Sequence, residues 1–174
     1  MPFKVMFHIW EPGKLAPCYS TSDRRLAYIE LNAMRAKPGM ALTTLKADVE
    51  AVESLTKAQR FVFQMWEVRK AMHKYYSGGR NHDDLVASLA LESALDKKIK
   101  ADREFIDSHP GRPVKDPAAY AFFLLVEEWR NTWHERKKFS QRKGYDLQIY
   151  REMSHKLRDY EAKIDSYIKE VIGL

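Results

Sequence analysis

The sequence predicts a mainly α-helical protein, a multi-helix bundle of five or six helices with a small N-terminal β-hairpin. Apolar residues recur at spacings of three and four through most of the chain, as they do along one face of a helix. The seven glycines and seven prolines among 174 residues cluster at a handful of places, which suits long helices joined by short loops. Only Phe3–Trp10, FKVMFHIW, is rich in β-formers and too short for a stable helix. We therefore expect a single domain (residues 1–174), in which a hairpin–helix unit (residues 1–36) packs on a helical bundle (residues 41–174).

The hairpin is predicted from the turn that follows its first strand. Glu11–Lys14 reads EPGK, with proline and glycine at the two central positions that a type II turn prefers. Residues 15–20 would return as the second strand, and Pro17, which lacks an N–H, would confine that strand to a sheet edge. An isolated hairpin is only marginally stable in water. We expect it to cap the bundle, with strand addition by another chain to its open edge as the alternative.

A first helix is expected to follow the hairpin. Residues 20–23, STSD, offer several N-caps, and Lys37-Pro38-Gly39 ends the helix after about Ala36. Its inner face would carry Leu26, Ile29 and Ala33.

Two apolar stripes then predict the next helical region. The first stripe is Leu42, Leu45, Val49 and Val52, and the second runs from Ala58 to Tyr76. The stripes are out of register around Ser54, so either one long helix with a shifted face or two helices could be present. We favour a kink or short break there, because Thr56 and Gln59 have the spacing of a capping box.

A helix from about His82 to Ser108 carries one charged residue on its apolar side. Its inner positions would be Leu85, Leu89, Leu95, Ile99 and Ile106, and Glu92 projects near their centre. A buried carboxylate must be paired or protonated, and perturbed carboxylates cluster at functional sites. We expect Glu92 to pair with an arginine or a tyrosine hydroxyl from a neighbouring helix, while an enzyme built around Glu92 is the third functional hypothesis.

The segment Asp116–Trp133 is predicted to be the central helix of the bundle. Asp116 is a good N-cap, and Pro117 suits the first helical position. Nine consecutive apolar residues follow, from Ala118 to Val126, which indicates a helix buried on several sides. This run is far shorter than the roughly 20 residues that span a bilayer.

The last helix is predicted from about Tyr145 to the C-terminus. Its apolar residues alternate at spacings of three and four, as in a heptad seam: Tyr150, Met153, Leu157, Tyr160, Ile164, Tyr167 and Val171. We expect the seam to pack inside the chain against the central helix, because the connecting loop is short. The alternative is pairing with another copy.

Positive charge is concentrated at the junction of these two helices. The segment 130–158, which we name the basic elbow, holds nine basic and three acidic residues, so it accounts for the whole net charge of +6. Aromatic residues are interleaved with the cations. Basic residues neutralise phosphates, and exposed aromatic rings can stack on unpaired bases. We predict an anion- or nucleic-acid-binding surface made of Arg130, Arg136, Lys137, Lys138, Arg142, Lys143 and Arg151.

Two other groups of residues could hold a metal ion. Asn81–Val86, NHDDLV, resembles the last acidic motif of the RuvC-like nuclease of phage terminases, where a carboxylate helps hold a divalent metal. Those nucleases take their other carboxylates from a preceding sheet, which we do not expect here, so we interpret Asp83 and Asp84 as the acidic start of a helix. Glu152 and His155 have the spacing of helical di-metal sites, but a second such pair is missing.

The sequence therefore favours a non-enzymatic protein whose basic elbow binds nucleic acid or an acidic protein surface. No phosphate-binding glycine loop, nucleophile elbow or Cys/His metal spacing is found, so we expect no cofactor and no catalytic residue. The lone cysteine, Cys18, fits a reducing compartment, and no signal peptide is visible, so we expect a cytoplasmic protein without a membrane partner. The alternative is a structural or assembly protein, viral or from a mobile element, that forms a homo-oligomer through the last helix or the hairpin edge.

Overall fold

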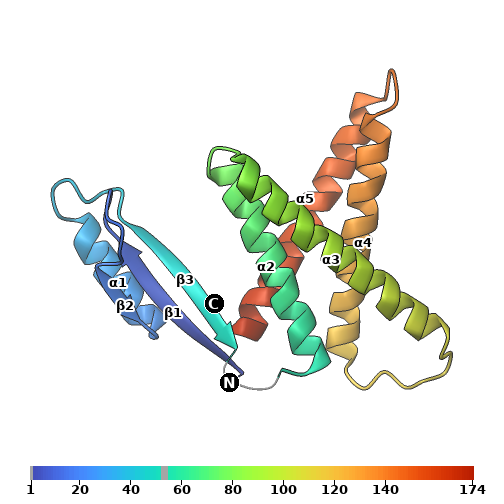
Figure 1. The fold of residues 1–174 in the computed structure, drawn as a ribbon, viewed down its shortest axis with the longest axis horizontal. Coiled ribbons are helices and arrows are strands. Elements are labelled where there is room, and N and C mark those ends of the chain that lie inside the picture. The colour runs from blue at the N-terminus through green and yellow to red at the C-terminus, as the bar shows by residue number, and fades with distance from the viewer. Residues whose placement is uncertain (1, 52–54) are drawn as a thin grey trace. The chain divides into compact units, whose positions relative to one another are not determined.

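The computed structural model describes residues 2–51 and 55–174, and these contain three β-strands and five α-helices (Figure 1). In chain order they are β1 (Phe3–Trp10), β2 (Tyr19–Thr21), α1 (Arg24–Arg35), β3 (Thr44–Ala51), α2 (Lys57–Ser77), α3 (His82–Asp107), α4 (Pro117–Ser140) and α5 (Leu147–Ile172). The prediction of a mainly α-helical protein with a small N-terminal β element is confirmed. The chain forms two compact units, Met1–Gln59 together with Lys169–Leu174, and Arg60–Ile168. We call the second the helical unit.

The N-terminal hairpin forms, and it belongs to a three-stranded antiparallel sheet of order β2-β1-β3. Its turn is the predicted one, since Gly13 has φ +75° and the Lys14 N–H donates to the Glu11 carbonyl at 3.3 Å. The returning strand β2 is shorter than predicted, and Pro17 lies outside it. The second edge of β1 is paired with β3 of the same chain rather than with another chain.

The helix predicted from Leu42 to Val52 is wrong, because Thr44–Ala51 forms β3. Val49 is buried whereas Lys46 and Asp48 are exposed, so the side chains alternate with the period of a strand, and Leu42 is 77% exposed. The physical reason is that β1 offers this segment a complete ladder of backbone partners, from Phe3↔Ala51 to Trp10↔Thr44.

Val52 and the break predicted near Ser54 lie outside the described residues. The capping box after it is confirmed, since Thr56 N–H donates to Gln59 Oε1 at 2.9 Å and Gln59 N–H to Thr56 Oγ1 at 3.2 Å.

Helix α1 packs on the sheet with a different face from the predicted one. Asp23 caps it by accepting from the Arg25 and Leu26 N–H groups, as expected. Its buried residues are Ala27, Leu31 and Met34, and the last two share a core with Ile9 of β1. The predicted inner residues are exposed instead, Leu26 at 49%, Ile29 at 55% and also Ala33. Both faces of α1 carry apolar residues, so the periodicity of this helix does not by itself select the face that meets the sheet.

In the helical unit, α4 is the helix that contacts each of the others. Phe61 of α2 packs on Phe122 and Phe123 with ring centroids 5.9 and 5.8 Å apart. Val126 and Trp129 are fully buried, as expected for a central helix, although Ala118 and Ala121 near its start are exposed. Asp116 caps α4 by accepting from the Ala119 N–H at 2.9 Å.

Helices α4 and α5 lie side by side in opposite directions and are joined by a short loop (Figure 1). The predicted seam of α5 is buried at Leu157, Tyr160 and Ile164, and the Tyr160 hydroxyl donates to Glu128 of α4 at 2.8 Å. The seam therefore packs inside the chain. Beyond Ile164 the buried positions are Ile168 and Ile172, because a straight helix of 3.6 residues per turn drifts away from a strict heptad.

Candidate functional site

The basic elbow forms one end of the α4–α5 hairpin. The Arg142 N–H donates to the Phe139 carbonyl, Gly144 adopts φ +69°, and Asp146 caps α5 by accepting from the Gln148 N–H at 2.7 Å. This turn brings the cationic last turns of α4 next to the first turns of α5, as Figure 1 shows for the two helix ends. The sequence segment is thus a continuous tip of the helical unit.

Six of the seven predicted site residues keep their charges available at this tip. Lys137, Lys138, Arg142, Lys143 and Arg151 are exposed, and Arg136 is half-buried. Within the described part of the chain none of the six forms an ion pair with a carboxylate. The Arg136 guanidinium instead donates to the Ser154 hydroxyl at 3.2 Å, which ties α4 to α5 and leaves its charge unneutralised.

Arg130, the seventh predicted residue, is structural. It is 3% exposed and donates to Glu92 at 2.8 Å and to Asp96 at 2.7 and 2.8 Å. Burial alone would lower the pKa of Arg130, but its hydrogen bonds to Asp96 and Glu92 raise it overall. Burial alone would likewise raise the pKa of Asp96, but Arg130 and then His134 lower it. Arg130 therefore joins α4 to α3, and its charge is neutralised there by two carboxylates.

The hydrogen bond from Arg130 also explains how the carboxylate of Glu92 can be buried. It is 7% exposed, and its two oxygens accept from the Ser88 hydroxyl at 3.0 Å and from Arg130 at 2.8 Å. The predicted pairing with an arginine of a neighbouring helix is confirmed. Its carboxylate therefore serves the packing of α3 on α4.

Aromatic rings accompany the cations of the basic elbow. Tyr145 lies between Phe139 and Tyr150, with ring centroids 5.9 and 5.6 Å away. The Arg142 guanidinium lies over Phe139 at 5.7 Å, and that of Arg136 over Tyr150 at 5.6 Å. The rings thus hold the cationic side chains in place near the surface.

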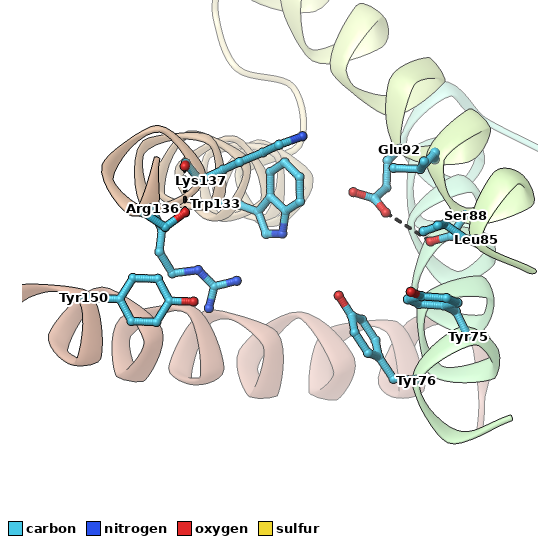
Figure 2. Close-up of a pocket in the computed structure, with 11 residues that line it drawn as sticks. Tyr75, Tyr76, Leu85, Ser88, Glu92, Trp133, Arg136, Lys137 and Tyr150 are labelled. Atoms are coloured by element: carbon cyan, nitrogen blue, oxygen red, sulfur yellow. Dashed lines mark hydrogen bonds between the residues drawn. The ribbon is translucent and has the colours of Figure 1, made fainter. Parts of the chain in front are cut away.

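A cavity of about 290 Å³ opens in the helical unit beside the basic elbow (Figure 2). All four helices of this unit line it. Helices α2 and α3 supply Tyr75, Tyr76, Leu85, Ser88, Leu89 and Glu92, and helices α4 and α5 supply Trp133, Arg136, Lys137, Ser140 and Tyr150. Arg136 and Lys137 therefore belong both to the elbow and to the cavity wall.

Most polar groups that face this cavity can donate a hydrogen bond. Figure 2 shows the Trp133 indole nitrogen, the Arg136 guanidinium and the hydroxyls of Tyr75, Tyr76 and Tyr150 turned towards its open centre. Among residues 2–51 and 55–174, no hydrogen-bond partner is found for the Trp133 N–H or for these three hydroxyls. Since the carboxylate of Glu92 is already paired with Arg130, the cavity suits a ligand that carries hydrogen-bond acceptors.

Sequence patterns singled out Glu92 in the α3 wall of this cavity, but they did not connect it with Tyr75 and Tyr76 of α2. Tyr75 and Tyr76 are adjacent, so one helix face cannot bury both, and Tyr76 is 62% exposed. The sequence signal for this wall was the position of the two tyrosines at the end of a helix, just before a glycine-containing loop. Trp133, at the end of the predicted central helix, is half-buried and forms part of the wall.

A second cavity of about 300 Å³ lies between α3 and α4, beside Asp96, Arg103, Glu127 and His134. Its charges are paired with each other. Arg103 forms a bidentate ion pair with Glu127, and its hydrogen bonds to that carboxylate raise the pKa of Arg103. His134 is 3.0 Å from Asp96. This groove is therefore less suited to a charged ligand than the cavity beside the elbow.

The two candidate metal motifs do not assemble a metal site. Asn81 is the N-cap of α3, and Asp84 pairs with Lys74 at 2.6 Å, so the NHDDLV segment is a helix start as interpreted. Glu152 and His155 are exposed on α5, away from its buried seam. In the described ranges, no group of three or more histidine, cysteine, aspartate or glutamate side chains could hold a metal ion.

Comparisons of the chain with protein-family models, with curated proteins and with solved structures find no match. Over the part that the structure describes, no helix has both the length and the apolar character that crossing a membrane requires.

Proposed function

We propose that this protein binds nucleic acid through the basic elbow, without carrying out a reaction on it. One observation carries the proposal. The six cations Arg136, Lys137, Lys138, Arg142, Lys143 and Arg151 gather at one hairpin tip, and in the described chain no carboxylate pairs with them. A solvated helix face normally intersperses both signs of charge. A cationic tip with aromatic rings matches the electrostatic footprint of a nucleic-acid-binding surface.

A charge-reversal titration tests this function. The variant replaces Arg136, Lys137, Lys138, Arg142 and Lys143 with glutamate, and gel shift measures binding to DNA and RNA at low salt. The matched control replaces five exposed lysines elsewhere with glutamate, which gives the same net charge: Lys14, Lys37, Lys97, Lys115 and Lys163. We expect the elbow variant to lose binding and the control to retain most of it.

Salt provides the second readout. The logarithm of the affinity should fall linearly with the logarithm of salt concentration, with a slope no steeper than about −5 if six cations contact phosphates. Absence of binding at low salt, or an equal loss in the dispersed control, would remove the proposal. Competition by a polyglutamate peptide as strong as by nucleic acid would indicate an acidic protein partner instead.

A second candidate function is assembly through the sheet, and the strand β3 favours it. β3 is eight residues long and lies at the edge of the sheet, so it offers backbone groups to a further strand. The seam of α5 does not serve this role, because it is buried inside the chain. Light scattering across a range of protein concentrations separates the candidates, since a stable oligomer favours assembly and a monomer that binds nucleic acid favours the first.

A further inference from the structure

We infer that the cavity beside the basic elbow receives an unpaired base, so that the protein selects single-stranded over double-stranded nucleic acid. This inference rests on the proposed function, because the same nucleic acid must lie on the elbow. It assigns a specific task to Tyr76, Trp133 and Tyr150, which the elbow alone does not require.

The cavity lies next to the cations of the basic elbow. Arg136 and Lys137 line the cavity and also belong to the row of elbow cations. A sugar–phosphate backbone held by these cations would therefore pass the mouth of the cavity. A base attached to that backbone is the chemical group closest to the opening.

The walls of the cavity match the edge and the face of a base. Base edges present carbonyl and ring-nitrogen acceptors, and the cavity presents donors from Trp133, Arg136 and three tyrosines, with no unengaged carboxylate (Figure 2). Tyr76, which is 62% exposed, offers a ring on which a base can stack, and such stacking tolerates any base. An acidic peptide would use the cations but has no flat ring to stack on Tyr76.

The size of the cavity separates single strands from duplexes. At about 290 Å³ it is just below the roughly 300–1,000 Å³ typical of ligand pockets, so it has room for one base but not for the width of a double helix. A base inside a duplex would first have to leave its stack, at a cost of a few kcal/mol. Single strands, whose bases are already unpaired, avoid that cost.

The test compares three oligonucleotide probes of equal phosphate number with the full-length protein. The probes are a single-stranded polypyrimidine, the same strand with abasic sugars throughout, and a hairpin duplex. Fluorescence anisotropy should show that the single strand binds at least tenfold more tightly than the other two. Equal affinities for all three would overturn the inference while leaving the elbow function intact, whereas no binding of any probe would remove the elbow function itself.

Side-chain variants locate the effect. Tyr76 is 62% exposed, so Tyr76→Ala should fold, and it should weaken single-strand binding by about 5- to 150-fold while leaving abasic binding unchanged. Tyr76→Phe, which keeps the ring, should retain most of the affinity. Tyr28→Ala, at a tyrosine of α1 that is 45% exposed, is the matched control and should change nothing. An unchanged single-strand affinity in Tyr76→Ala would contradict the inference.

A free mononucleotide carries the same base and phosphate groups and could occupy the cavity in place of an oligonucleotide. Uridine monophosphate, added as competitor, should displace the oligonucleotide only at concentrations far above that of the oligonucleotide itself, because it lacks the phosphates that the other elbow cations contact. Displacement at equal concentration would show a mononucleotide site and would overturn selection of single strands.

Discussion

At the scale of single residues, Arg130 and Arg136 belong to the same helix but have opposite environments. Arg130 is 3% exposed and paired with Glu92 and Asp96, whereas Arg136 is half-buried, donates to the Ser154 hydroxyl and lies over the Tyr150 ring. In the sequence both count equally towards the basic elbow. Only the position of α3 shows that carboxylates neutralise Arg130 and do not neutralise Arg136.

This difference leads to a prediction for protein stability. Arg130→Met would leave Glu92 in the interior without its cationic partner, so we expect it to lower the free energy of unfolding by about 3–5 kcal/mol. Arg151→Met, at an exposed position of α5, should change it by less than about 0.5 kcal/mol. Urea denaturation followed by circular dichroism measures both. Similar small effects for the two variants would show that the Arg130 contacts are dispensable.

At the scale of elements, the apolar residues of two segments led to wrong predictions. For β3 the type of secondary structure was wrong, and for α1 the buried face was wrong. Leu45 and Val49 fit both a helical stripe and a strand alternation, because a spacing of four satisfies either period. The choice depends on whether a neighbouring strand edge is available. The edge of β1, more than thirty residues earlier in the chain, is such a partner.

A pair of substitutions tests β3. The predicted helical stripe buried both Leu42 and Val49, whereas the structure buries Val49 and leaves Leu42 77% exposed. We expect Val49→Ala to lower the free energy of unfolding by about 2 kcal/mol through lost burial and a cavity. Leu42→Ala should cost less than about 0.5 kcal/mol. A larger cost for Leu42→Ala than for Val49→Ala, measured by urea denaturation, would support the helix instead.

At the scale of the whole molecule, the charge distribution matters more than the net charge of +6. Outside the basic elbow acidic and basic residues balance, and several of them form ion pairs, such as Arg69 with Asp165 at 2.8 Å. Within the elbow the cations are close together and repel each other. Such repulsion destabilises the folded chain, and a bound polyanion would relieve it.

The repulsion predicts a response to salt in the absence of nucleic acid. The test variant has glutamine at Arg136, Lys137, Lys138, Arg142 and Lys143. At low ionic strength its Tm should be higher by a few degrees, which corresponds to a free energy of unfolding higher by up to about 1 kcal/mol. The gain should diminish in about 0.5 M salt, where charges are screened over a few ångströms. Glutamine at Lys14, Lys37, Lys97, Lys115 and Lys163 is the control and should raise the Tm less. An equal gain in both variants, measured by differential scanning calorimetry, would show that the elbow cations do not interact.

Local signals in the sequence were sufficient to determine the ends of most elements. Asp23, Asn81 and Asp116 cap their helices as expected, and the EPGK turn forms, because these contacts join residues within a few positions of each other. The seam of α5, the inward position of Glu92 and the basic composition of the elbow could also be predicted, since helical periodicity and charge are properties of a short segment.

The tertiary structure decided everything that depends on a distant partner. It decided that residues 44–51 pair with β1, which face of α1 is buried, that Arg130 is joined to α3, and that Tyr76 and Trp133 share a cavity. Each of these outcomes depends on which surface another element presents. A segment's own periodicity shows that it has an apolar or charged face, but the partner that meets that face is determined only when the whole chain has folded.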